Sequence, residues 1–196
     1  MKRIKFPKPV RTKISFYRMK KQLAAGTEKL GKGYFAFVYT HKRKHNTVIK
    51  IGLCGSIDKV GTSPHNDGYL AFLKKTQRYP KNPFFPKVHS IKLYKHVNRF
   101  DRSTFYYVIE MEKLVRFFDV KRRSPLLKKW FKIYDTDEMD SYTLKPSNMK
   151  GVFAKQAAKV VRSLFEQFHI DIHEDNYMWR VTNQKSPQLV ITDPAA

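Results

Sequence analysis

Cysteine, acidic side chains and long apolar runs are all scarce in this sequence. The single cysteine, Cys54, leaves no disulfide framework and is typical of a protein in a reducing compartment. No apolar run approaches the roughly 20 residues of a membrane span, and the N-terminus lacks the apolar region of a signal peptide. We therefore expect a soluble, cytoplasmic protein that has no membrane partner.

Acids are outnumbered by bases, and the excess is uneven along the chain. The formal net charge is +24, and residues 1–50 hold fifteen Lys or Arg against one acid, Glu28. Such a basic segment predicts attraction to nucleic acid or to acidic protein surfaces, although a Lys-rich surface kept for solubility explains the charge equally well. We interpret residues 1–27 as a basic, loosely docking N-terminal arm through which nucleic acid is an expected partner.

The rest of the chain has the composition of a folded domain. Fifteen Phe, eleven Tyr and two Trp in 196 residues argue against disorder and favour one domain, or one built from two lobes. Residues 34–40 (YFAFVYT) and 47–53 (TVIKIGL) predict two strands of a hairpin. Apolar spacing predicts further elements: helices near 66–77, 125–134 and 151–168, and strands at 87–97, 104–114, 177–180 and 188–193.

Two features of the hairpin point to a bound phosphate. Gly31 and Gly33 precede its first strand, and closely spaced glycines let a backbone approach phosphates, although two glycines before a strand are also typical of a plain turn. Lys50 lies in an apolar strand, where its ammonium needs a carboxylate or phosphate unless the strand is an edge. Asp67 is a candidate partner for Lys50, although an Asp that precedes Gly68 is more typical of a helix N-cap.

The string FHIDIHEDNYMW, residues 168–179, is the most informative stretch. A metal triad built on His169 and Asp171 is disfavoured because no histidine follows His173. Phosphoryl transfer from ATP needs a carboxylate to orient a hydroxyl, an amide and a second carboxylate to hold magnesium, and a lysine for the phosphates. Asp171, Asn176, Asp193 and Lys50 supply these groups.

These motifs resemble a known family. LGKGYFAFVY, VIK, IEMEKL, HIDIHEDN and ITDP resemble the glycine-rich loop, strand lysine, hinge, catalytic loop and magnesium-binding segment of the protein-kinase-like fold. The form H-x-D-x-H-x-x-N is similar to the branch that includes aminoglycoside and choline kinases. The longer string LGKGYFAFVYTHKRKHNTVIKIG, with DIHEDNYMW and ITDP, resembles the early serine/threonine protein kinases of T-seven-like bacteriophages.

The resemblance implies a role for each matching residue, with ATP and Mg²⁺ as cofactors. Asp171 would be the catalytic base, and Lys50 would contact the phosphates. Asn176 and Asp193 would bind magnesium. The expected nucleotide contacts are Gly31 and Gly33 over the triphosphate, with Ala36 in the place of a third glycine, the backbone of Glu110, Met111 and Glu112 against adenine, and Ile109 as the gate behind it; His173 and Glu174 are expected to make structural hydrogen bonds.

The same resemblance implies an α+β, minimal two-lobed kinase-like fold. Residues 28–112 would be an N-lobe with an antiparallel sheet, and residues 113–196 a truncated helical C-lobe, since the sequence given stops three residues after Asp193. The implied activity is serine/threonine protein kinase activity on host proteins, including RNA polymerase, in the host cytoplasm during phage infection. The alternative is a catalytically inert kinase-like protein that binds and inhibits a host protein or nucleic-acid complex. A small-molecule kinase is disfavoured because the lobe that would shape its pocket is missing.

Overall fold

The computed structural model describes residues 6–33, 35–55, 61, 63–116, 151–164, 167–168, 176–181 and 188–193. Within these ranges the helices are α1 (Phe16–Ala24), α2 (Gly68–Thr76) and α4 (Val152–Arg162), with a short 3₁₀ helix η1 (Pro64–Asn66). The strands are β1 (Val10–Thr12), β2 (Lys29–Lys32), β3 (Ala36–Thr40), β4 (Thr47–Leu53), β5 (Val88–Val97), β6 (Ser103–Glu112), β7 (Val115–Arg116), β8 (Tyr177–Arg180) and β9 (Gln188–Ile191).

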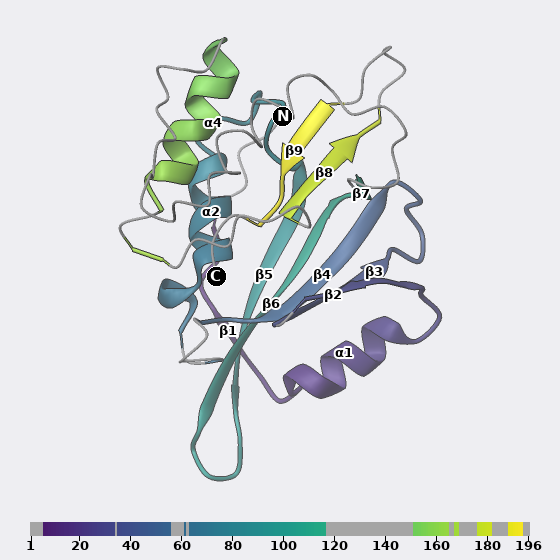
Figure 1. The fold of residues 1–196 in the computed structure, drawn as a ribbon. Coiled ribbons are helices and arrows are strands. Elements are labelled where there is room, and N and C mark those ends of the chain that lie inside the picture. The colour runs from purple at the N-terminus through teal and green to yellow at the C-terminus, as the bar shows by residue number, and fades with distance from the viewer. Residues whose placement is uncertain are drawn as a thin grey trace, which may run out of the picture.

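The strands form two sheets in an α+β arrangement. The larger sheet has six strands in the order β1-β5-β6-β4-β3-β2, and the smaller has the order β7-β8-β9. All neighbours in the larger sheet are antiparallel except β1, which pairs parallel with β5. The sheet is therefore mixed because of β1, whereas its strands within residues 28–112 are all antiparallel, as the sequence predicted. Figure 1 shows β8 and β9 beside the larger sheet, on the side where α2 and α4 lie.

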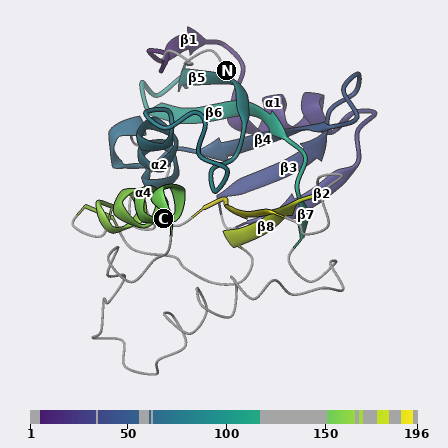
Figure 2. The same cartoon turned by 90° about the horizontal axis from the view of Figure 1, so that it is seen from above.

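Side chains alternate between the two faces of the larger sheet, and each face has its own core. Figure 2 shows α1 on one side and α2 with α4 on the other. On the α1 side, Phe16 packs with Tyr39, Ile51 and Tyr106. Because Lys50 precedes Ile51 in β4, its side chain points to the opposite face, toward α2. That face holds the larger core, which includes Phe72, Leu73, Leu93, Tyr107, Ile109, Ala157, Val161 and Trp179.

Residues 6–27 are part of the fold, which differs from the loosely docking arm that the composition suggested. Phe16 is 4% exposed, and Ser15 caps α1 by accepting from the Arg18 N–H at 3.4 Å. The Tyr106 hydroxyl donates to the Ile14 carbonyl at 2.8 Å. The amphipathic spacing of α1 was obscured by the lysines and the arginine that lie between its apolar residues.

The local patterns predicted several elements correctly. The β3–β4 hairpin, the helix α2 and the strands β5, β6, β8 and β9 all form where they were expected. Helix α4 ends at Arg162, and Val152 and Phe153 are 70% and 46% exposed, although their spacing suggested the buried face. They lie in the first turn, and burial begins with Ala154. The helix expected near 125–134 lies outside the described residues.

None of the helices in the described ranges has the length and apolar character needed to cross a membrane.

Close packing of β4 against β6 gives the first prediction. A Cβ atom placed on Gly52 would lie 2.3 Å from the ring and hydroxyl of Tyr107, its cross-strand partner, which is almost fully buried. We expect Gly52→Ala to lower the free energy of unfolding by about 1–3 kcal/mol, because the buried ring must move. Urea unfolding measures this. The control is Gly31→Ala, where the new methyl meets none of the described residues within 4 Å; an equal loss in both variants would contradict the packing explanation.

Candidate functional site

Lys50 forms an ion pair with Asp193 that joins distant parts of the chain. The Nζ atom of Lys50 in β4 lies 2.6 Å from Oδ2 of Asp193, two residues after β9, and the two residues are 143 positions apart. The lysine side chain is 11% exposed and the aspartate 33%. A buried ammonium requires such a partner. The sequence predicted that Lys50 needs a carboxylate or phosphate, but it did not identify Asp193 as the carboxylate. The pair lies where the two sheets meet.

Lys50 also lies on an aromatic ring. Its Nζ is 3.4 Å from the centre of the Tyr69 ring, in α2, and the Tyr69 hydroxyl donates to Sδ of Met111 at 3.5 Å. Burial, and then the nearby charges of Asp193 and Asp67, raise the pKa of Tyr69 well above its ordinary value, so the phenol stays neutral. The ring therefore provides a desolvated cation–π contact, which adds to the ion pair in holding the ammonium.

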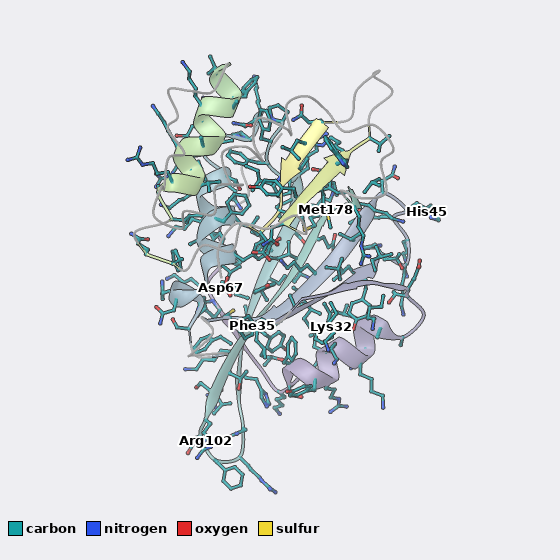
Figure 3. The ribbon with its side chains drawn as sticks, viewed as in Figure 1. Lys32, Phe35, His45, Asp67, Arg102 and Met178 are labelled. Carbon is teal, nitrogen blue, oxygen red and sulfur yellow. The ribbon has the colours of Figure 1, made fainter. Side chains whose placement is uncertain are left out.

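Asp67 serves as the N-cap of α2. Its carboxylate accepts from the Leu70 N–H at 2.7 Å and the Gly55 N–H at 3.2 Å, and it lies where α2 meets the sheet (Figure 3). Of the two roles considered from the sequence, the hydrogen bonds establish the cap, while the ion pair of Lys50 is with Asp193. The charges of Lys50 and Asp193 still act on Asp67. Burial, opposed by the Leu70 N–H and reinforced by Asp193, raises the pKa of Asp67 to about 7.

The raised pKa of Asp67 predicts a pH dependence of stability. The unfolded carboxyl has a pKa near 3.8 and the folded one near 7, so between these values the folded state binds the proton that the unfolded state has lost. The free energy of unfolding should therefore fall as pH rises from about 4 to about 7, by up to about 4 kcal/mol, and then level off. Denaturant unfolding across this range should show the fall in the wild type and a smaller one in Asp67→Asn, whose amide still caps the helix. An equal fall in the free energy of unfolding in the wild type and in Asp67→Asn would contradict the assignment of this pH dependence to Asp67.

Asn176 is held next to Asp193 by the backbone. Its carbonyl accepts from both the N–H and the hydroxyl of Thr192 at 2.8 Å, just beyond the pairing of Tyr177 with Ile191. Asn176 is buried. An amide oxygen and a carboxylate oxygen are ligands of the kind that Mg²⁺ takes, so the donor types fit. Among the residues that the structure describes, no group of three or more His, Cys, Asp or Glu could hold a metal.

Three predicted residues lie in one row across the larger sheet. The three are Gly31, Lys50 and Ile109. Gly31 pairs with Val38, Val38 pairs with Lys50, and Lys50 pairs with Ile109, so the three predicted residues and Val38 lie on the same face. Two strand spacings place Gly31 about 10 Å from Lys50. Among the described residues, no atom lies within 4 Å of a Cβ built on Gly31, so they leave the space above it open.

The turn after β2 is closed by a hydrogen bond. The Gly33 N–H donates to the Ala36 carbonyl at 2.8 Å, and a Cβ on Gly33 would meet that same oxygen only at 3.8 Å. Packing against the described part of the chain therefore does not require glycine at either position. The hydrogen bond is explained by a plain turn, which was one of the two interpretations of these glycines. The described residues also leave space above Gly31, in the row that contains Lys50, where a ligand could lie.

The predicted hinge residues belong to the sheet. Glu110 and Met111 pair with residues of both β4 and β5, and the Glu112 N–H donates to the Lys87 carbonyl at 2.9 Å. Sheet pairing therefore occupies backbone groups that were expected to face adenine. Ile109 is fully buried, as a gate residue would be. The Glu110 carboxylate accepts from Lys44 at 2.9 Å, which lowers the pKa of Glu110.

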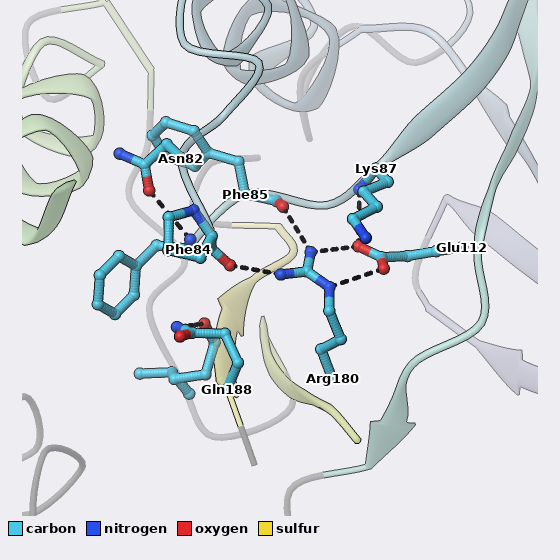
Figure 4. A network of polar contacts seen from close by, with 9 residues as sticks. Asn82, Phe84, Phe85, Lys87, Glu112, Arg180 and Gln188 are labelled. Carbon is cyan, nitrogen blue, oxygen red and sulfur yellow. Dashed lines mark hydrogen bonds and ion pairs between the residues drawn. The ribbon is translucent and has the colours of Figure 1, made fainter. Parts of the chain in front are cut away.

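Arg180 and Glu112 form a network that the sequence did not indicate. Nε of Arg180 donates to Oε2 of Glu112 at 2.8 Å, and its other nitrogens reach Oε1 of Glu112 and the carbonyls of Pro83 and Phe85 (Figure 4). Both side chains are 12% exposed. Through this network β8 is fastened to the end of β6 and to the loop before β5, which fixes the strand pair that carries Asn176 and Asp193.

The residue expected to be the catalytic base, Asp171, lies outside the described residues, as do His169, His173 and Glu174. The structure thus brings together Lys50 and Asp193, places Asn176 beside the latter, and puts Gly31 in the same row as Lys50. Tyr69 was missed as a support for Lys50 because an aromatic residue in a buried helix is expected simply as core.

The sequence matches no model of a known protein family and no curated protein.

Proposed function

We propose that this protein is a kinase-like phosphotransferase that uses ATP and Mg²⁺ to phosphorylate serine or threonine of host proteins, including the transcription machinery, during phage infection. The observation that carries the proposal is the ion pair between Lys50 and Asp193. It links a phosphate-binding type of cation to a metal-binding type of carboxylate, on the face of the sheet where Gly31 and Ile109 also lie.

Each residue then has a defined task. Lys50 has three N–H donors, so it can keep its bond to Asp193 and also donate to a nucleotide phosphate. The Asp193 carboxylate and the Asn176 amide would hold magnesium, which when bound neutralises charge on the transferred phosphoryl group. The Tyr69 ring holds the lysine in place through its cation–π contact with the ammonium. Asp171 is assigned, from the resemblance, to orient the hydroxyl of the protein substrate.

The catalytic contribution expected from such a site is positioning and charge neutralisation. The ammonium is held by a fixed carboxylate and a fixed ring, so little reorganisation accompanies phosphate binding. The open space above Gly31 leaves the backbone of β2 accessible to the phosphates.

Nucleotide affinity with and without Mg²⁺ tests the proposal most directly. We expect the full chain to bind ATP more tightly with Mg²⁺, and Asp193→Asn to lose most of this magnesium effect. Asp101→Asn is the matched control, because Asp101 lies at the tip of the β5–β6 hairpin and its positive φ of 55° is tolerated by asparagine. Isothermal titration calorimetry measures the dissociation constant of ATP in the presence and in the absence of Mg²⁺. An absence of ATP binding in either condition would overturn the kinase proposal.

A second candidate is a catalytically inert kinase-like protein that inhibits a host protein or nucleic-acid complex by binding. The net charge of +24 favours it. Glu110, Glu112 and Asp193 are each paired with one base inside the protein, so these acids do not neutralise the other basic side chains. Inhibition of host growth or transcription by Lys50→Met and Asp193→Asn distinguishes the two candidates. Undiminished inhibition supports binding alone, and lost inhibition with retained fold supports catalysis.

A further inference from the structure

The hairpin that joins β5 to β6 projects beyond the rest of the fold, with Arg102 near its tip (Figures 1 and 3). The tip is ordered by Asn98, whose side-chain oxygen accepts from the N–H groups of Phe100 at 2.9 Å and Arg102 at 3.0 Å. The Asn98 N–H also donates to the Arg102 carbonyl at 3.1 Å. The hairpin therefore presents its outermost side chains in a defined arrangement.

Positive charge is concentrated on this hairpin and on β1, which lies along it. Arg11 of β1 pairs in register with Lys95 of β5, so two like charges lie side by side on one face of the sheet. Such a pair is unfavourable within the protein, and a polyanion bound across it would relieve the repulsion. We define the hairpin surface as Lys8, Arg11, Lys13, Lys95, Arg99, Phe100 and Arg102; Asp101 is the single acid among residues 8–13 and 95–102.

An exposed aromatic ring lies among these charges. Phe100 is 67% exposed, and the guanidinium carbon of Arg99 lies 4.8 Å from the centre of its ring. A second pair, Lys95 with Phe105, has the ammonium 5.5 Å from the ring centre. An exposed aromatic face flanked by cations is the combination on which unpaired nucleobases stack while their phosphates meet the charges.

We propose that the hairpin surface binds single-stranded nucleic acid. A duplex keeps its bases stacked inside, so it would use the charges and leave Phe100 in water. An acidic protein surface would likewise satisfy the charges without needing a stacked ring at the tip. The surface is separate from the site at Lys50, so this inference is independent of the proposed kinase activity.

Fluorescence anisotropy with the full chain tests the proposal, with a labelled oligothymidine and a duplex of equal length as probes at several salt concentrations. We expect tighter binding to the single strand. Arg11→Gln with Lys95→Gln should reduce the slope of log affinity against log salt by about 1.4, the value for two lost phosphate contacts. Phe100→Ala should weaken single-strand binding by about fivefold or more and leave duplex binding unchanged.

The matched control is Arg78→Gln with Lys81→Gln. It removes the same charge from exposed positions before β5, whereas the tip follows the far end of that strand. Circular dichroism verifies that each variant is folded. The proposal is overturned if the control loses as much affinity as the Arg11 and Lys95 variant, if Phe100→Ala binds the single strand normally, or if the duplex binds more tightly. Lys50→Met should bind the oligonucleotide like the wild type, even if the kinase proposal fails.

Discussion

Replacing Arg180 by alanine is expected to lower the free energy of unfolding by about 3–5 kcal/mol, because it leaves the buried charge of Glu112 without its partner. The guanidinium bonds Glu112 and also the carbonyls of Pro83 and Phe85, at 2.8 and 3.0 Å. All of these acceptors lose a donor at once. Lysine cannot reproduce the planar, multidentate geometry, so Arg180→Lys should recover only part of the loss. Chemical denaturation followed by fluorescence measures the change.

A double-mutant cycle separates this network from general damage to β8. Since Arg180 and Glu112 act on each other, the double variant Arg180→Ala with Glu112→Ala should be more stable than the sum of the single losses predicts, with a coupling of about 1–3 kcal/mol. Arg78→Ala, at an exposed position, is the control and should change stability by less than about 0.5 kcal/mol. Strict additivity of the two single losses would show that the ion pair does not carry the effect.

The second large effect is expected for phosphoryl transfer. If the proposed function is correct, Lys50→Met and Asp193→Asn should each lower the rate of transfer from radiolabelled ATP, measured by autophosphorylation or on host protein extracts, by about 100-fold or more. Lys50→Met removes a phosphate contact, and Asp193→Asn removes a metal ligand. Lys113→Met controls for loss of charge alone and should transfer at the wild-type rate.

Loss of activity has to be distinguished from loss of fold, because each single variant leaves one member of a partly buried pair without its partner. The double variant Lys50→Met with Asp193→Asn leaves neither charge behind, so it should unfold at a denaturant concentration closer to that of the wild type than either single variant. It should nevertheless be inactive. Activity in this double variant would rule out the assigned roles.

The sequence predicted those parts of the fold that depend on neighbouring residues. The β-branched and aromatic runs at 34–40 and 47–53 predicted the β3–β4 hairpin, and Tyr69, Leu70, Phe72 and Leu73 of α2 are buried as expected. The positions of Lys50 and Asp193 within recognisable motifs anticipated that they would share a site. Their direct contact depends on how the two sheets pack, which no local pattern encodes.

The remaining features were hidden for identifiable reasons. Arg180 occupies an ordinary strand position, and its importance depends on Glu112 and on two carbonyls in a loop about 95 residues earlier. Parallel pairing of β1 with β5 joins positions 10–12 to 94–96, so it has no signature in either segment alone. The hinge was expected to start at Glu110, yet β6 stays paired with β4 through Glu112 and with β5 through Met111.

The distance in sequence between Lys50 and Asp193 also bears on protein synthesis. Translation runs from the N-terminus, so β4 is made long before the residue that neutralises its lysine. On a ribosome the ammonium of a nascent chain would still face solvent or a transient partner, and the pair could form only after residue 193 had left the exit tunnel. The Lys50–Asp193 pair therefore waits for the synthesis of the intervening residues, and a chain terminated before residue 193 would lack it.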